Sequence, residues 1–261
     1  MTWQRDVSGK DMQSVDWTID GLPEETQKLL RAYVKDVTKV YGSELEGIIL
    51  YGSAVRGEFL LGRSNLNLLL VMSSYNLAAF KKYDSLHKRW SKDQVVVPLF
   101  LTVHDIQSAS VAFPLEYQDI HDCRRLLWGQ DPFVGLKIDT RYLAAEVLQT
   151  LRGNLLRLRQ RLVEGRSTEE AITILLALSI TALLPALRGV QRLLGRPVLA
   201  HGEPLLNDLE TTLAVDLTGL RDALLLKRGQ ISPGQNEIPR LMDRYLEGLT
   251  RLVIAAEARI T

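Results

Sequence analysis

The segments 47–57 (GIILYGSAVRG) and 64–71 (SNLNLLLV) decide the fold of this chain. Their apolar runs predict two strands, separated by a Gly-Ser turn, a short helix and a loop. A helix N-terminus offers free backbone N–H groups and a favourable dipole, so Gly52 and Ser53 indicate a phosphate-binding turn. Because side chains alternate along a strand, Asn65 and Asn67 should leave the second strand on the same face.

The composition is that of an ordinary globular protein, with 261 residues, 46% hydrophobic and 24% charged. A formal net charge of +1 gives no bulk field that would favour nucleic acid or an anionic membrane. The single cysteine, Cys123, excludes an internal disulfide and a cysteine-based zinc site. The start of the chain lacks an apolar signal core, and the most apolar run, 171–187, contains polar residues. We therefore expect a cytoplasmic protein that does not span a membrane.

The pattern of apolar residues changes along the chain from mixed elements to helices only. Residues 1–20 show no periodic pattern and predict a loosely attached leader, and residues 104–137 read as less regular. The strands expected are 46–51, 65–72 and 94–103, with helices at 22–41, 76–90, 139–164, 168–194, 203–227 and 236–260. This pattern predicts an α+β head at 21–138, a mixed sheet with helices, followed by an all-α helical bundle at 139–261.

The motif at the start of the head resembles that of the polymerase-beta-type nucleotidyltransferases. These carry Gly-Ser, then Ala/Val-Arg-Gly, then Ser-Asp-hydrophobic-Asp-Leu. The helical second half makes the chain similar to the aminoglycoside nucleotidyltransferases, in which the bundle helps to form the acceptor pocket. The resemblance implies a nucleotidyltransferase-like fold, with a short strand within Arg125–Trp128 before a turn. It also implies that Gly52, Ser53 and Arg56 contact the phosphates of ATP or another nucleoside triphosphate.

The same resemblance places the family's two metal-binding aspartates at Asn65 and Asn67. The third family carboxylate is expected within Val95–Thr102, which contains no acid. Mg²⁺ binds through carboxylates and substrate phosphates, and each lost charge–charge term at about 4 Å is on the order of 4 kcal/mol. We therefore predict no metal site and no assigned catalytic residue, with Mg²⁺ disfavoured as a cofactor. The acid-free third strand favours natural loss over laboratory substitution of these positions.

Three functions remain open at this point. The leading one is a degenerate nucleotidyltransferase that binds a nucleotide or phosphate and acts as a regulatory or interaction module. The second is an active enzyme that transfers a nucleoside monophosphate to a hydroxyl group, with metals held by acids such as Glu58 or Glu116. The third is a ligand-free interaction scaffold with a protein partner or a second copy. Arg56 could pair with a phosphate, or tie the turn to a nearby acid such as Glu58.

Overall fold

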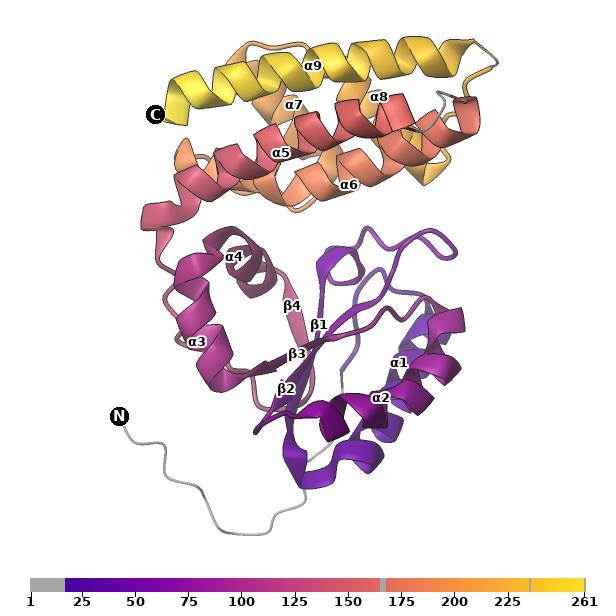
Figure 1. Cartoon of the computed structure of the whole chain (residues 1–261), viewed down its shortest axis with the longest axis vertical. Helices are drawn as coiled ribbons and strands as arrows, with labels where there is room; N and C mark the ends of the chain where they lie inside the picture. The colour runs from indigo at the N-terminus through magenta and orange to yellow at the C-terminus, as the bar shows by residue number, and fades with distance from the viewer. Residues whose placement is uncertain (1–16, 165–167, 235, 261) are drawn as a thin grey trace.

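A computed structural model describes residues 17–164, 168–234 and 236–260 of the chain (Figure 1). The first half holds a sheet with helices on both sides, and the second half is helical. We call the elements from α1 to β4 the head and those from α5 to α9 the bundle. The bounds of the helices and strands in the head are α1 Glu24–Tyr41, β1 Leu45–Tyr51, β2 Asn67–Met72, α2 Leu77–Trp90, β3 Leu99–Thr102, α3 Val103–Ala112, α4 Pro114–Asp122 and β4 Arg124–Gly129. Short 3-10 turns lie at Gly42–Glu44, Gly52–Ala54, Ser91–Asp93 and Thr140–Tyr142.

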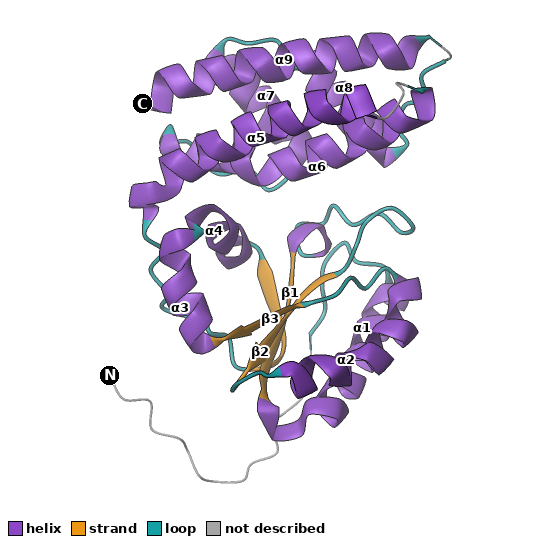
Figure 2. Ribbon diagram, viewed as in Figure 1, coloured by secondary structure: helices purple, strands orange, loops and turns teal. Residues whose placement is uncertain are grey.

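The head sheet is mixed, in the order β3-β2-β1-β4. Strand β1 pairs antiparallel with β2 and with β4, whereas β2 pairs parallel with β3. Helices α1 and α2 cover one face of the sheet, and α3 and α4 cover the other (Figure 2). The continuous apolar character of β1 and β2 follows from this, because both strands are buried on both faces. The α+β fold class predicted for the head is confirmed.

Strand β3 is shorter than the expected strand at 94–103. It begins at Leu99, after Pro98, and lies at the edge of the sheet. A proline cannot donate to a ladder, which explains why regular pairing starts only beyond it. The residues after β3, expected to be less regular, form α3 and α4. Thr102 and Asp105 cap the start of α3 through reciprocal hydrogen bonds.

The bundle consists of α5 Leu143–Glu164, α6 Glu169–Leu193, α7 Gly202–Leu213, α8 Thr218–Arg228 and α9 Glu237–Ile260. The single helix expected at 203–227 is wrong, because the chain breaks between α7 and α8. Ala214 takes a left-handed conformation there, with φ at 54°. The Asp216 carboxylate then accepts a hydrogen bond from the backbone N–H of Thr218 at 2.8 Å, which begins the next helix.

The end of the expected leader at 1–20 packs into the head. Trp17 and Ile19 are buried in the same apolar cluster as α1 and β1, and the indole of Trp17 donates a hydrogen bond to the carbonyl of Leu127 at 3.0 Å. The expected loose attachment is therefore wrong for the last residues of the leader. Their apolar side chains are too few to form a periodic pattern in the sequence. Residues 1–16 of the expected leader lie outside the described residues. The domain limits at 20 and 138 stay predictions.

Helix α6 is more apolar than the sequence pattern suggested. Its 25 residues include a window of mean hydropathy 2.0, so by length and composition alone it could cross a membrane. The polar residues of this run were expected to exclude a membrane span, and length and composition alone do not exclude it. One such helix is weak support for a membrane span, since α6 packs against α5, α8 and α9 in the bundle. Location in the cytoplasm stays a prediction.

Candidate functional site

The Gly52-Ser53 turn directly follows β1, as the sequence predicted, and its backbone requires glycine. Gly52 has φ at +83°, and a Cβ built on it would lie 2.8 Å from the Nδ2 of Asn67. The expected short helix is only a three-residue 3-10 turn, Gly52–Ala54. Such a turn aligns few peptide dipoles, so it contributes little of the anion attraction that a longer helix would supply.

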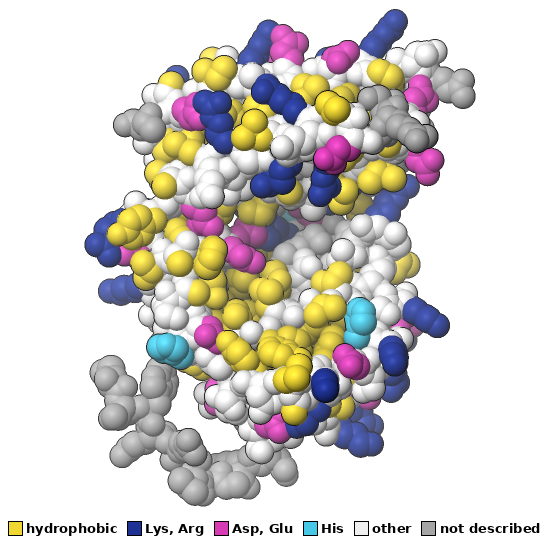
Figure 3. Space-filling view, viewed as in Figure 1, with side chains coloured by type: hydrophobic (Ala, Val, Ile, Leu, Met, Phe, Trp, Pro, Cys, Tyr) yellow, Lys and Arg dark blue, Asp and Glu magenta, His cyan; other side chains and the backbone are white. Residues whose placement is uncertain are grey.

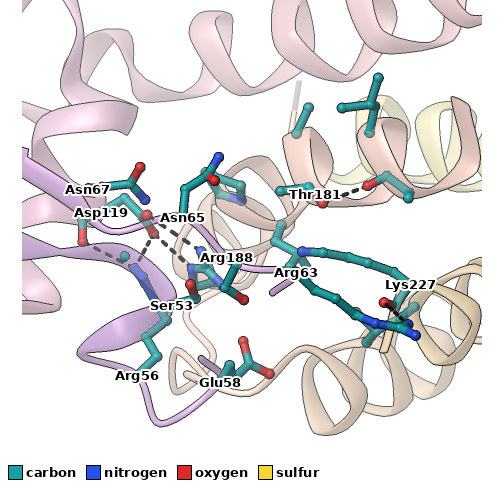
Figure 4. Close-up of a pocket in the computed structure, with 18 of the residues that line it drawn as sticks. Ser53, Arg56, Glu58, Arg63, Asn65, Asn67, Asp119, Thr181, Arg188 and Lys227 are labelled. Carbon is teal, nitrogen blue, oxygen red and sulfur yellow. Dashed lines mark hydrogen bonds and ion pairs between the residues drawn. The ribbon is translucent and has the colours of Figure 1, made fainter. Parts of the chain in front are cut away.

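Asn65 and Asn67 both face the cavity beside this turn (Figure 4). Asn67 pairs with Tyr51 at the start of β2, while Asn65 precedes the strand. The third strand carries no acid beside them. Along the edge between β2 and the segment that leads into β3, Asn67 lies between the bridge Leu66–Val95 and the pair Leu69–Leu99. The residues of that segment opposite Asn67 are therefore Val96, Val97 and Pro98.

Arg56 is buried and bound to a carboxylate, but that carboxylate belongs to Asp119 and not to Glu58. Its Nη2 lies 2.7 Å from the Oδ1 of Asp119 and donates to the Asp119 carbonyl at 3.2 Å. A second arginine, Arg188 of α6, donates from Nε to the same Oδ1 at 2.8 Å. Figure 4 shows Asp119 between these two guanidinium groups. One carboxylate thus serves two cations, which leaves an excess of positive charge.

The Nη1 of Arg188 has no hydrogen-bond partner within the described residues, although the atom is buried. The arginine side chain is only 7% exposed and lines the cavity. An unsatisfied buried donor on a charged group costs about 1–3 kcal/mol or more. The atom is enclosed by protein, so this donor is an unsatisfied internal group of a residue that otherwise lines the cavity.

The cavity has a volume of about 950 Å³ and lies between the head and the bundle. Figure 3 shows the surface hollowed there, with basic and acidic side chains inside. Five basic and four acidic side chains line it among the described residues: Arg56, Arg63, Arg188, Lys227 and Arg228, with Glu58, Glu116, Asp119 and Glu146. All the residues predicted for the site, Gly52, Ser53, Arg56, Asn65 and Asn67, line the same cavity.

Contacts across the cavity mouth join the loop after the Gly-Ser turn to the bundle. The carboxylate of Glu58 accepts hydrogen bonds from Arg228 of α8 and, at 2.8 Å, from the backbone N–H of Gly202. The guanidinium of Arg63 donates to the carbonyl of Lys227 at 3.0 Å. These contacts hold the loop of the head against α7 and α8.

Three other titratable side chains of the cavity, Tyr51, Glu146 and Glu116, differ in their pKa shifts and in their hydrogen bonds. Burial raises the pKa of Tyr51 to about 12, and the charges of Glu116 and Asp119 add to this. Burial also raises the pKa of Glu146, with repulsion from Glu116 adding and a hydrogen bond from the Leu115 N–H opposing. Glu116 makes no hydrogen bond or ion pair within the described part of the chain.

Lys227 contributes a second incompletely neutralised cation. Burial lowers the pKa of its ammonium group, Arg228 adds to this effect, and Glu58 opposes it. Among described residues no acceptor contacts its Nζ. Sequence reasoning missed Asp119, Arg188 and Lys227, which come from α4, α6 and α8. An arginine inside the apolar sequence of α6 was the available signal, since a charged residue is rarely buried unless paired.

Three comparisons with known proteins bear on the fold. No family model matches the chain, and no curated protein matches it. A solved structure, spectinomycin adenyltransferase AAD(9) from Enterococcus faecialis with ATP and spectinomycin, is similar with a TM-score of 0.55. It is 12% identical, and the match covers 88% of this chain and 99% of that one. At this identity the match shows the fold, which is nucleotidyltransferase-like.

Proposed function

We propose that this chain is a nucleotidyltransferase-fold protein that binds a nucleotide or another phosphate-bearing ligand without metal-dependent nucleotidyl transfer. The observation that carries the proposal is the charge of the cavity. Neutral amides stand at Asn65 and Asn67, while two buried arginines share the single carboxylate of Asp119. A phosphate would be neutralised here by guanidinium groups.

The residues present do not fit the magnesium ions that the fold implies. Mg²⁺ requires near-octahedral oxygen ligands and is held through carboxylates. Asn65 and Asn67 each offer one neutral carbonyl oxygen, and Asp119 already accepts from Arg56 and Arg188. Within the described residues no three His, Cys, Asp or Glu side chains are grouped to hold a metal ion. The proposed function therefore involves no metal ion.

Guanidinium groups suit the role that this proposal gives them. Arginine stays charged at all working pH values and binds phosphate through two parallel N–H···O bonds. Arg56 and Arg188 both line the cavity, as does Ser53, which adds a hydroxyl donor. The similar structure of AAD(9) is described with ATP, which makes ATP the first nucleotide to test.

Active transfer with other metal ligands is the second candidate. Glu58 is unsuited to it, since its carboxylate is bound to Arg228 and to the N–H of Gly202. The observation in favour of an active enzyme is Glu116, whose carboxylate lines the cavity without a hydrogen-bond partner in the described part of the chain. Its carboxylate is the group that an active enzyme would use.

Calorimetry with ATP, in EDTA and then in Mg²⁺, tests the proposal. We expect binding in EDTA that Mg²⁺ does not strengthen, and no release of pyrophosphate with or without added hydroxyl compounds. Ser53→Ala and Arg188→Met should weaken the binding, while Arg244→Met, a control on α9 paired with Asp222, should not. Binding that requires Mg²⁺ and is followed by pyrophosphate release lost in Glu116→Gln would establish the active enzyme instead. No binding of ATP, inorganic phosphate or an organic phosphate at any concentration reached would contradict the proposal and favour a scaffold.

A further inference from the structure

Helix α6 has two apolar faces, and the bundle covers only one of them. Leu176, Ile180, Leu183 and Leu187 are fully buried in the bundle core. On another face, Ile174 and Leu178 are 53% and 52% exposed. A helix at the surface of a globular protein normally has a polar outward face. The second apolar face of α6 therefore lacks a partner within the described chain.

This second face lines the cavity. Ile174, Leu178 and Ala182 are spaced four residues apart, so they lie one above the other on the helix, and all three border the cavity with Ala177 and Pro185. No charged residue of α6 lines the cavity before Arg188. Thr173 and Thr181 of α6 also border the cavity, and their hydroxyls donate to carbonyls of the helix itself. One wall of the site is thus mostly aliphatic over several turns and ends at a buried arginine.

We propose that this wall binds the apolar body of the ligand, so that the ligand is an anion joined to an aliphatic or aromatic group. The inference rests on the anion site of the proposed function and adds the chemistry of the rest of the molecule. Arg56 and Arg188, which share one carboxylate and line the same cavity, supply the charge complementarity that selects a ligand over a second copy or a membrane. At 1.5 Å per residue, Leu178 and Arg188 are separated by about 15 Å along the helix, which sets the scale of the ligand.

The acidic side chains of the cavity argue against a polycationic ligand. Glu58 and Asp119 are already bound to arginines. Only Glu116 and Glu146 remain for an amine, and the pKa of Glu146 is raised by burial and by Glu116. A ligand with several ammonium groups would also meet Arg188 and Lys227 in the same cavity.

The test compares three probes of known chemistry: inorganic phosphate, octyl phosphate and octylammonium, each below its micelle concentration, by calorimetry. Each methylene removed from water contributes about a fourfold gain in affinity. If half of the chain is buried, we expect octyl phosphate to bind about 250-fold more tightly than phosphate. Octylammonium, with the same chain and the opposite charge, should bind more weakly than octyl phosphate.

Variants locate the effect on the wall. Leu178→Ser should weaken octyl phosphate binding about tenfold and leave phosphate binding unchanged. Ile254→Ser is the matched control, because Ile254 is 59% exposed on α9 and does not line the cavity. It should change neither affinity. Because both side chains are half exposed, both variants should fold, which thermal unfolding of each checks.

Several results would overturn the inference. Equal affinity for phosphate and octyl phosphate, or a gain that survives Leu178→Ser, shows that the wall takes no part. Octylammonium binding as tightly as octyl phosphate shows that charge does not select the ligand. Leu178-dependent binding to phosphatidylcholine vesicles that octyl phosphate does not displace identifies a membrane as the occupant.

The results also separate this inference from the proposed function. ATP binding without octyl phosphate binding contradicts only the apolar wall. Octyl phosphate binding that depends on Arg188 and Leu178, without ATP binding, contradicts only the nucleotide. Binding of neither contradicts both.

Discussion

Replacing Asp119 by Asn should destabilise the protein and strengthen anion binding at the same time. Asp119 accepts from Arg56 and Arg188, whose side chains are 4% and 7% exposed. Removing one partner of a buried ion pair leaves an uncompensated charge and costs about 3–5 kcal/mol. The lower end applies here, because Arg56 keeps its hydrogen bond to the Asp119 carbonyl.

A loss of about 3 kcal/mol corresponds to a fall in melting temperature of about 6–12 °C in a chain of this size. Phosphate should stabilise the variant more than it stabilises the natural protein, because the two guanidinium groups of the variant no longer share the Asp119 carboxylate. We expect about a tenfold gain in phosphate affinity, which is a small part of a charge–charge term on the order of 4 kcal/mol at close range. A ligand that binds only the folded state stabilises it according to its concentration relative to Kd.

Thermal unfolding in increasing phosphate, with calorimetry at 25 °C, measures both effects. Asp131→Asn is the matched control, since Asp131 binds Arg124 at 2.9 Å outside the cavity. It should lower stability without changing phosphate affinity. The reasoning is refuted if Asp119→Asn is as stable as the natural protein, or if phosphate raises the melting temperature of both proteins equally.

Three further predictions concern stability. Gly52→Ala should lose about 1–2 kcal/mol from backbone strain plus a clash with Asn67. Gly62→Ala, at a similar φ with nothing within 4 Å of the added Cβ, should lose only the stability that backbone strain costs, as measured by urea unfolding. Burial is the main cause of the raised pKa of Glu146. The protonated carboxyl therefore stabilises the folded protein below the unfolded pKa near 4.5, and this stabilisation is lost as the pH rises through the pKa of the folded state. Glu146→Gln should therefore be the more stable protein at pH 7 and equal to the natural one at pH 3.5, and equal profiles would contradict this. Tyr245→Phe removes a buried 2.8 Å hydrogen bond to Ser179 and should lose about 1 kcal/mol, measured by urea unfolding.

The sequence predicted those parts of the fold whose signals are local. Strands β1 and β2 and helices α1 and α2 carry long apolar periods with clear ends, such as Gly42 after α1 and Asn76 before α2. The break at Ala214 was missed because a left-handed alanine has no sequence signature. The burial of Trp17 was missed because it depends on a hydrogen bond to Leu127, which is 110 residues away.

The candidate site divides in the same way. Gly52, Ser53, Asn65 and Asn67 belong to one contiguous motif, so their proximity follows from the order of two strands. Arg188 and Lys227 reach the cavity only through the packing of α6 and α8 against the head, which no local pattern encodes. Arg56 was correctly expected to meet either a phosphate or an acid, but the acid, Asp119, is 63 residues away.

The position of the arginines decides what restoring the two aspartates would do. In Asn65→Asp/Asn67→Asp, new carboxylates would face the same cavity as Arg56 and Arg188. An arginine already in place pairs with a carboxylate without the dehydration that Mg²⁺ resists. The third strand would still offer only Val96, Val97 and Pro98 at this level.

We therefore expect the double variant to bind ATP more weakly in EDTA and to gain no pyrophosphate release in Mg²⁺. Calorimetry and a pyrophosphate assay, with Asn207→Asp on α7 as a control outside the cavity, measure the two effects. Magnesium-dependent transfer in the double variant would show that the cavity retains a usable metal site and that two amides alone silence it. Weaker ATP binding without transfer would support a site in which arginines supply the positive charge and which two new carboxylates do not convert into a magnesium site.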